Sequence, residues 1–265
     1  MNRKIEKAGP PDEARELKLC GLAAVRARFQ RDAKSINRLY FDYETGRKIG
    51  LICKALAAAR KIYRCVEPRE LEKIAGSIHH GGIVAVVAET ALRPATPAEI
   101  AQWARRKEPL LVLDRIGNAH NLGAIARTAA FFGVPRLVIP EDPAAARPTE
   151  AAYRVAEGGM EHIEIRAAAA VAPFLRDLAT AGYEVVGAAA PNAPGEGPNS
   201  LQSIKKDLRS GAPIALVLGN EEHGLSPSVA AACTRLVTIP GKDRVDSLNV
   251  SAAAAVLIWE LFGQG

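Results

Sequence analysis

Several familiar signatures of catalysis are missing from this 265-residue sequence. It contains neither a GxxxxGKS/T phosphate-binding loop nor a GxGxxG segment after a strand-like run, so nucleotide hydrolysis and dinucleotide binding have no support. Its five histidines never stand in the HExxH spacing or another metal-binding spacing, which argues against a metal site. The cysteines include no CxxC pair, and we expect all four to be reduced and buried: Cys20, Cys53, Cys65 and Cys233.

Long apolar segments are also missing. No apolar run reaches the roughly 18 residues that a membrane-spanning helix needs. The N-terminus, MNRKIEKAGPPDEARELK, has charges where a signal peptide would have an apolar core. We therefore expect a cytoplasmic protein that makes no membrane contact, long enough for one large domain or two ordinary ones.

Charge is unevenly distributed along the chain. Residues 1–92 contain 18 Lys and Arg against 11 Asp and Glu, whereas residues 93–265 contain 17 against 18. A basic module joined to a nearly neutral one suggests that the first part binds a polyanion such as nucleic acid. Charge alone leaves a second possibility open, because many domains carry a solvated basic face.

The first part of the sequence predicts a small α/β module behind a flexible tail. Residues 1–14 are polar with a Pro-Pro step, which is typical of a disordered end. Residues 93–108 are rich in proline and charge and are predicted to be a linker. Between them, in the module at 15–92, we expect helices at 19–29, 46–60 and 71–75, and strands at 35–41, 63–66 and 83–88.

The second part, residues 109–265, alternates between strand-like and helical segments. Its strand candidates are continuous apolar runs, which favours a mostly parallel sheet covered by helices on both faces. A helix is predicted to close the chain at 249–262. The expected strands are 110–114, 136–140, 162–166, 183–189, 214–219 and 235–240.

Three polar segments of this second part each follow a strand-like run. The first is LDRIGNAHNLGAIARTAAFFGV at 113–134. We expect Asn121 to cap its helix, Gly123 to let backbone or ligand approach closely, and Gly133 to end the helix. Taken alone, the segment is also compatible with an ordinary capped helix that carries Arg127 on its surface.

The second segment, ALVLGNEEHGLS at 215–226, predicts a tight loop at the carboxyl end of a strand. Open α/β sheets bind ligands at this edge. The pair Ser226-Pro227 would begin the next helix. A plain strand-to-helix turn accounts for that pair, but it does not explain the glycines on either side of Glu221.

The third segment is VTIPGKDRVDSLNVSAAAAVLIWE at 237–260, and it leads into an apolar helix. Ser247 and Asn249 are good capping residues. Leu248 between them could face either the core or an adenine.

Together, the three segments resemble the motifs of the SpoU (TrmH-like) family of RNA ribose 2′-O-methyltransferases. The matching residues are NLGAIARTA at 121–129, LGNEEHGLS at 218–226 and IPGKDRVDSLNVSAA at 239–253. The preceding module resembles the L30e-like substrate-binding domain of this family, through CGLAAV at 20–25 and HHGGIVAVV at 79–87. The resemblance covers nearly the whole chain beyond the tail.

The resemblance implies a fold, a cofactor and partners. Residues 109–265 would form a SPOUT domain with a deep trefoil knot, and residues 15–92 an L30e-like RNA-binding domain. The protein would be a homodimer paired through its C-terminal domain, acting on tRNA or ribosomal RNA. S-adenosyl-L-methionine would be bound by Leu218, Gly219, Ile239, Leu248 and Asn249, and the catalytic group would be Asn121, Arg127, Glu221, Ser247 and Asn249.

Two roles for Arg127 are open. The family's arginine is often described as the base, yet a guanidinium has a pKa above about 12 and normally only donates hydrogen bonds. Arg127 could instead bind the neighbouring phosphate and stabilise the developing alkoxide. Glu221 and Ser247 would then orient Arg127 and Asn121.

The sequence departs from the family pattern at one place. Many relatives have a glycine in the loop where this chain has Lys242-Asp243-Arg244. The added bulk and charge could tune the RNA contact or weaken cofactor binding.

RNA affinity would come from the first domain. Tyr40, Phe41 and Tyr43 could stack on bases, although we expect at least two of them to pack in the core. The basic residues that could contact RNA are Arg26, Arg28, Arg31, Lys34, Arg38 and Lys48, with Arg47 and Lys54 beside them.

Two other functions compete with this interpretation. One is a catalytically silent SpoU-like protein that only binds RNA, and the presence of all five motif residues argues against it. The other is a methyltransferase that modifies something other than ribose, which the RNA-type first module makes less plausible.

Overall fold

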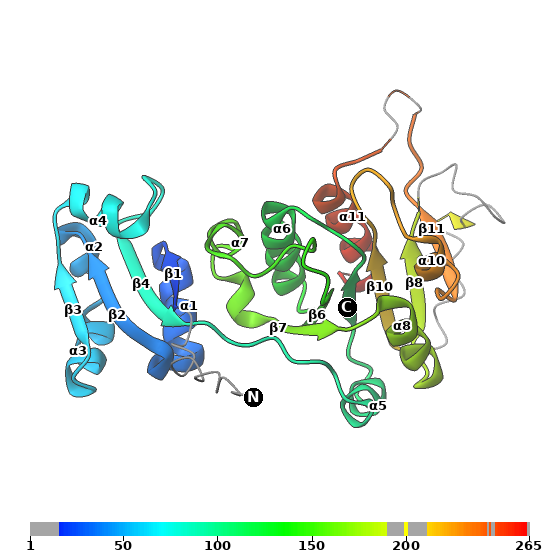
Figure 1. The fold of residues 1–265 in the computed structure, drawn as a ribbon, viewed down its shortest axis with the longest axis horizontal. Coiled ribbons are helices and arrows are strands. Elements are labelled where there is room, and N and C mark those ends of the chain that lie inside the picture. The colour runs from blue at the N-terminus through cyan, green and yellow to red at the C-terminus, as the bar shows by residue number, and fades with distance from the viewer. Residues whose placement is uncertain (1–15, 190–198, 201–210, 243, 245–246, 264–265) are drawn as a thin grey trace, which may run out of the picture.

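The structure is a computed structural model that describes residues 16–189, 199–200, 211–242, 244 and 247–263. The chain forms two lobes, each built around its own β-sheet, with an extended segment running from one to the other (Figure 1). The predicted tail at 1–14 lies outside the described residues, and so does Asp243 of the loop that differs from the family pattern.

The first lobe is built on a four-stranded sheet. Strand β4 pairs antiparallel with both β1 and β2, and β2 pairs parallel with β3. In spatial order the strands are β1 (Glu16–Cys20), β4 (Ile83–Ala88), β2 (Ile36–Phe41) and β3 (Ile62–Cys65). The helices are α1 (Leu22–Asp32), α2 (Tyr43–Gly46), α3 (Gly50–Ala58) and α4 (Pro68–Ala75), with the 3₁₀ turn η1 (Ala33–Ser35).

Two helices predicted in this lobe are present, but their predicted ends were wrong. Leu19 lies in strand β1, where it and Leu17 point into the core on alternate positions, and the turn at Gly21 (φ 94°) separates that strand from α1. Pairing with β4 along the whole of β1 favours the extended conformation over the local helical pattern. The helix expected over 46–60 is α3, which is shorter at both ends, and α2 is a separate short helix that ends at Gly46.

A seven-stranded sheet forms the second lobe, and each neighbouring pair of its strands is parallel. This confirms the predicted α/β fold. The spatial order is β7 (Glu164–Ala168), β6 (Arg136–Pro140), β5 (Leu110–Leu113), β10 (Ile214–Leu218), β8 (Glu184–Ala188), β11 (Arg235–Thr238) and β9 (Asn199–Ser200). The helices are α5 (Pro97–Arg105), α6 (Ala119–Phe131), α7 (Glu150–Ala156), α8 (Val171–Thr180), α10 (Pro227–Ala230) and α11 (Val250–Phe262), with the 3₁₀ turn η2 (Gly159–His162).

Helices cover both faces of this parallel sheet. Leu111 and Leu113 of β5 face a core shared with α6, α7 and α11, while Leu110 and Val112 face a second core under α5, α8 and α10. The continuous apolar strands predicted from the sequence are therefore buried on both sides. Within the described ranges, no helix is long and apolar enough to cross a membrane.

The segment predicted as a linker contains helix α5. Thr96 and Glu99 form a capping box at its start, and the backbone N–H of Thr96 together with Arg166 lowers the pKa of Glu99 to about 2. Ile100 and Trp103 are buried against the sheet. Residues 97–105 thus belong to the second core, although their proline and charge content resembles that of a linker.

The cysteines are free thiols, and they are less buried than expected. Cys65 is exposed, and the other three are half-buried. Burial raises the pKa of Cys233 to about 12, so this thiol stays protonated at neutral pH.

A buried ion pair joins the two lobes. Arg28 of α1 bonds Glu161 of η2 at 2.9 Å and donates to the Tyr153 hydroxyl of α7 at 3.3 Å. Apolar residues of both lobes surround this pair in one continuous core. Desolvation raises the pKa of Glu161, and the charge of Arg28 opposes that shift. Arg28 is only 4% exposed, so the expectation that it contacts RNA was wrong.

Removing Arg28 should destabilise the protein strongly. In Arg28→Met, Glu161 becomes a buried charge with a weaker partner, and we expect a loss of about 3–5 kcal/mol in the free energy of unfolding. The loss should shrink as pH falls, because the raised pKa of Glu161 lets the folded variant bind a proton there and become neutral. Urea unfolding measured across acidic and neutral pH checks both statements.

Arg26→Met is the matched control, since Arg26 lies exposed on the same helix. Its effect should stay within about 0.5 kcal/mol at every pH. Equal losses in the two variants would contradict the role given to the Arg28–Glu161 pair.

Candidate functional site

The carboxyl ends of β5 and β10 meet at one edge of the parallel sheet. Leu113 pairs with Leu218 in the register, and the next backbone N–H, that of Asp114, donates to the Leu218 carbonyl at 2.8 Å. The Asp114 carboxylate is buried and accepts a hydrogen bond from the backbone N–H of Ser226 at 2.6 Å. Asp114 therefore closes the loop that follows β10.

That loop, residues 219–226, is a compact turn. Asn220 and Gly224 exchange two backbone hydrogen bonds of 3.0 Å, and the Asn220 side chain accepts from the backbone N–H groups of Glu222 and His223. Gly224 has a φ of 65°, which favours glycine. At Gly219 a Cβ atom would overlap the backbone of Gly224, so no side chain fits there. The glycines on either side of Glu221 are thus required by the turn.

Asn121 differs from its prediction. Helix α6 begins at Ala119, and Asn118 is its cap, accepting a hydrogen bond from the backbone N–H of His120 at 2.8 Å. Asn121 lies in the first turn and its side chain is free to donate to the Glu221 carboxylate at 2.6 Å. Asn118 and Asn121 are both suitable helix caps. Asn118 takes that role, and Asn121 binds the nearby Glu221.

Asn249 completes a chain of three side chains. Its amide donates to the Asn121 carbonyl oxygen at 3.3 Å, and its own carbonyl oxygen accepts from the backbone N–H and hydroxyl of Ser251. Asn249 is the N-cap of α11, which confirms its predicted capping role. Residues from all three sequence motifs, Asn249, Asn121 and Glu221, are therefore linked by hydrogen bonds.

Two other predicted site residues stand apart from this chain. Arg127 is 55% exposed on α6 and forms an ion pair with Glu157 at 3.0 Å. Ser247 is exposed, two residues before Asn249. Gly123 does permit a close approach, but its neighbour is α7: a Cβ atom there would lie 2.9 Å from the Cβ of Val155.

The residues expected to bind the cofactor include exposed apolar surface beside the hydrogen-bonded chain. Leu248 is 48% exposed, Ile239 is half-buried, and Leu218 is buried at the end of β10. The hydroxyl of Thr238, next to Ile239, is buried and has no hydrogen-bond partner among the residues that the structure describes. Aliphatic side chains that contact the faces of a purine, together with a glycine-lined loop, fit an adenosine group.

A cavity of about 300 Å³ borders the loop after β10. Asp114 and Asn220 were not predicted as site residues from the sequence. Asp114 could have been found, because it is a lone carboxylate directly after an apolar strand. Asn220 also donates to the Arg115 carbonyl at 2.8 Å and to Glu221 at 3.3 Å. The lining residues are Arg115, Gly117, Asp142, Ala144, Ala145, Asn220, Glu222 and His223.

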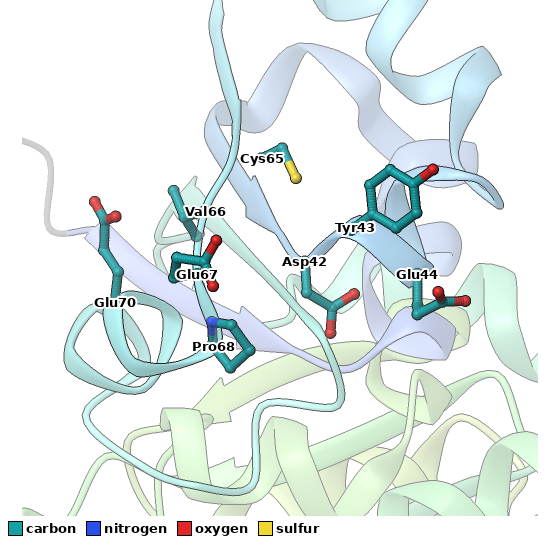
Figure 2. A pocket seen from close by; sticks show the side chains of 8 residues that line it. All are labelled: Asp42, Tyr43, Glu44, Cys65, Val66, Glu67, Pro68 and Glu70. Carbon is teal, nitrogen blue, oxygen red and sulfur yellow. The ribbon is translucent and has the colours of Figure 1, made fainter.

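A second cavity, of about 410 Å³, lies in the first lobe at the carboxyl ends of β2 and β3. Figure 2 shows the carboxylates of Asp42, Glu44, Glu67 and Glu70 among the side chains that line it. A surface with this charge repels phosphate. None of the motif residues lines this cavity, and its charge is unsuited to RNA.

The basic and aromatic residues of the first lobe differ in accessibility. Phe41 is buried, Tyr40 packs against a core cluster, and Tyr43 is 71% exposed. This confirms that at least two of the three aromatic residues pack in the core. Arg38 pairs with Glu16, and Arg31 donates to the Met160 carbonyl at 3.3 Å. Of the basic residues that were named from the sequence for RNA contact, the exposed ones are Arg26, Arg31, Lys34, Arg47, Lys48 and Lys54.

Comparison with known families agrees with this geometry. Residues 108–259 match the family described as SpoU rRNA Methylase, and residues 18–92 match a domain described as RNA 2′-O ribose methyltransferase substrate binding. This protein belongs to the SpoU methylase family.

Particular relatives extend over most of the chain. The sequence is 32% identical over 246 residues to the 23S rRNA (guanosine-2′-O-)-methyltransferase RlmB of Nitrosomonas europaea, covering 92% of this chain and 90% of the relative. It is 34% identical over 247 residues to the RlmB of Ralstonia nicotianae, covering 93% and 95%. The crystal structure of the AdoMet-bound rRNA methyltransferase from Sinorhizobium meliloti has the same fold, with a TM-score of 0.75 at 24% identity over 94% of this chain and 87% of that one.

The turn after β10 should not tolerate a side chain at its first glycine. Gly219→Ala would force its Cβ against the Gly224 backbone, and we expect a loss of about 1–3 kcal/mol in the free energy of unfolding by overpacking. Gly50→Ala is the control, because a Cβ atom there meets nothing within 4 Å. Chemical denaturation of both variants checks this, and a Gly219→Ala protein as stable as the wild type would show that the loop is looser than described.

Proposed function

We propose that this protein transfers a methyl group from S-adenosylmethionine to the 2′-hydroxyl of a ribose in RNA. The observation that carries the proposal is the chain of hydrogen bonds from Asn249 through Asn121 to Glu221. It joins the three family motifs at the edge of a parallel sheet where such sheets bind ligands. The cavity beside Asn220 adds room for a nucleotide next to this group.

The cofactor supplies a methyl group that is already activated on a sulfonium. Leu248 and Ile239 offer apolar contacts for its adenine, with Leu218, Gly219 and Asn249 beside them. The protein must then hold the ribose hydroxyl in line, about 3–3.5 Å from the methyl carbon. The Glu221–Asn121–Asn249 chain keeps the walls of this site in place.

Arg127 acts as an electrostatic clamp in this proposal. Its guanidinium binds the neighbouring RNA phosphate and stabilises the negative charge that develops on the ribose oxygen. Ser247 lies in the loop that leads into Asn249 and faces solvent, where a substrate can reach it. Lys242 and Arg244 of the same loop are exposed and add positive charge near the RNA.

The proposed substrate is a guanosine of 23S ribosomal RNA. Relatives that match over nearly their full length carry this activity in their names. The first domain, at 15–92, supplies RNA affinity through its exposed Arg26, Arg31, Lys34 and Lys48, supported by Arg38, while 109–265 carries the chemistry. A cytoplasmic location is part of the same proposal, because ribosomal RNA is its substrate.

Incubation with labelled S-adenosylmethionine tests the proposal. The wild-type protein should transfer label to unmodified 23S rRNA, and the modified linkage should resist alkaline cleavage because its 2′-oxygen is blocked. Arg127→Ala should lose at least about 100-fold in methyl transfer, while its affinity for the cofactor stays within about twofold. Calorimetry measures the affinity.

Other outcomes identify the competing functions. RNA binding without transfer to any RNA fraction would indicate a silent RNA-binding protein. Label at alkali-sensitive positions would indicate methylation of a base. Label in tRNA alone would change the substrate and leave the chemistry intact.

The proposal also includes a homodimer paired through the second domain. An apolar surface on α6 and α11 supports it: Phe131 is 82% exposed, Trp259 47% and Val256 39%. The ring of Phe132 connects Phe131 and Trp259, at centroid distances of 5.0 and 5.7 Å. A trefoil knot at the C-terminus belongs to the same family-based proposal, and the contact of Asn249 with α6 is compatible with it.

Phe131→Glu should separate the dimer. A charge placed in an apolar interface is desolvated without a partner, so the variant should sediment as a monomer where the wild type sediments as a dimer. Leu51→Glu is the control, because Leu51 is 80% exposed on α3 in the other domain. Analytical ultracentrifugation decides the question, and a monomeric wild type would refute the proposal.

A further inference from the structure

Arg127 is held by a residue outside the three motifs. Its Nη2 atom lies 3.0 Å from a carboxylate oxygen of Glu157, and both side chains are more than half exposed. This contact is an ion pair at one nitrogen of a guanidinium that has five N–H donors in all. Glu157 can therefore restrict Arg127 without occupying all of its binding capacity.

The backbone at Glu157 is in an unusual conformation. Glu157 follows the last residue of α7 with φ 45° and ψ 44°, a left-handed position that glycine normally takes at a helix end. A residue with a side chain persists in such a conformation when the surrounding structure holds it there. Gly158 follows with φ 93°.

The segment Glu157–Glu161 is packed tightly on two sides. A Cβ atom at Gly159 would lie 2.8 Å from the Cα of Arg127, and one at Gly158 would lie 3.2 Å from the Ala23 carbonyl oxygen of α1. The segment therefore touches the backbone of the residue that Glu157 pairs with. It also touches the first domain.

The far end of the segment is anchored to the same helix of the first domain. The Met160 carbonyl accepts a hydrogen bond from Arg31, and Glu161 forms the buried pair with Arg28. Glu157 is thus the exposed end of a backbone whose other end is fixed between the two domains.

We propose that Glu157 is a positioning residue for Arg127, which orients its guanidinium toward the RNA phosphate while α1 of the first domain holds the segment in place. This inference rests on the proposed function, in which Arg127 is the electrostatic clamp. An exposed arginine samples many rotamers, and an anchored carboxylate reduces that freedom before RNA arrives. The benefit appears in turnover, since orientation matters most in the transition state.

Glu157→Ala should therefore lower kcat by about 5–20-fold, because misplacement of a charged group at a reacting centre costs rate steeply. The KM for RNA and the affinity for S-adenosylmethionine should change by less than about twofold, as expected for an interaction that serves the transition state. Glu157→Gln should recover most of the turnover, because its amide oxygen can accept a hydrogen bond from the guanidinium of Arg127. Steady-state methylation of 23S rRNA measures these values.

Two comparisons make the result specific to Arg127. Glu72→Ala removes an exposed carboxylate of α4 in the first domain and should leave kcat unchanged. In an Arg127→Lys background, Glu157→Ala should have little further effect, because both changes disturb the same guanidinium contact. An undiminished effect in that background would show that Glu157 acts elsewhere and overturn the inference.

The outcomes also separate this inference from the function on which it rests. If the wild-type protein methylates RNA and Glu157→Ala has unchanged or higher turnover, the positioning role alone is refuted. If the wild-type protein transfers no methyl group, the proposed function fails and this inference fails with it.

Discussion

The parallel pairing of β10 with β5 is the constraint on which the site depends. Because the two strands run in the same direction, their carboxyl ends and the loops that follow lie at the same edge of the sheet. The backbone bond from Asp114 to Leu218 continues that pairing, and the Asp114 carboxylate then ties down Ser226 at the far end of the loop. Glu221 is presented to Asn121 by this loop. An antiparallel arrangement would place the two motifs at opposite edges.

A second constraint is the close packing of α6 against α7. Glycine at 123 allows the two helices to approach within van der Waals distance of their backbones, and Gly159 allows the turn after α7 to lie against Arg127. Through this turn, the helix that carries Asn121 and Arg127 is connected to the first domain. The buried Arg28–Glu161 pair gives that connection a defined geometry, because a charged pair inside an apolar core is stable only when its two members meet.

The charges of the first domain acquire a clearer meaning in this arrangement. Its basic excess is not one uniform RNA-binding face, since Arg28 is used inside the protein and Arg31 is partly engaged at the domain contact. Its acidic residues are equally uneven, and four of them gather around the cavity between α2 and α4 (Figure 2). Four carboxylates around that cavity would repel RNA phosphates, whereas the residues proposed to attract them, Arg26, Lys34 and Lys48, are exposed.

Most elements of the second domain could be predicted from the sequence because long apolar strands and capped helices are local patterns. Strands β5, β6 and β10 lie where they were expected, and Gly133 ends α6 with φ 71°. The errors occurred where a local pattern had two solutions. The segment ELKLC at 16–20 is compatible with either a strand or a helix. The segment NAHN at 118–121 contains two asparagines that could cap the helix. Helix α5 was predicted as a linker because its segment is rich in charge and proline and only two of its residues, Ile100 and Trp103, are buried.

By itself, the sequence determined the alternation of strands and helices and the three motif loops, and it supplied the residues proposed to bind a methyl donor. Each of these follows from residue types at short spacing. Only the tertiary structure decided that Asn121 binds Glu221, that Arg28 is buried, and that Glu157 holds Arg127. Hydrogen bonds and ion pairs form at about 3 Å in space, and the partners of Asn121 and Arg28 lie 100 and 133 residues away along the chain. A pattern of neighbouring residues in the sequence cannot show which residues that far apart along the chain meet in space.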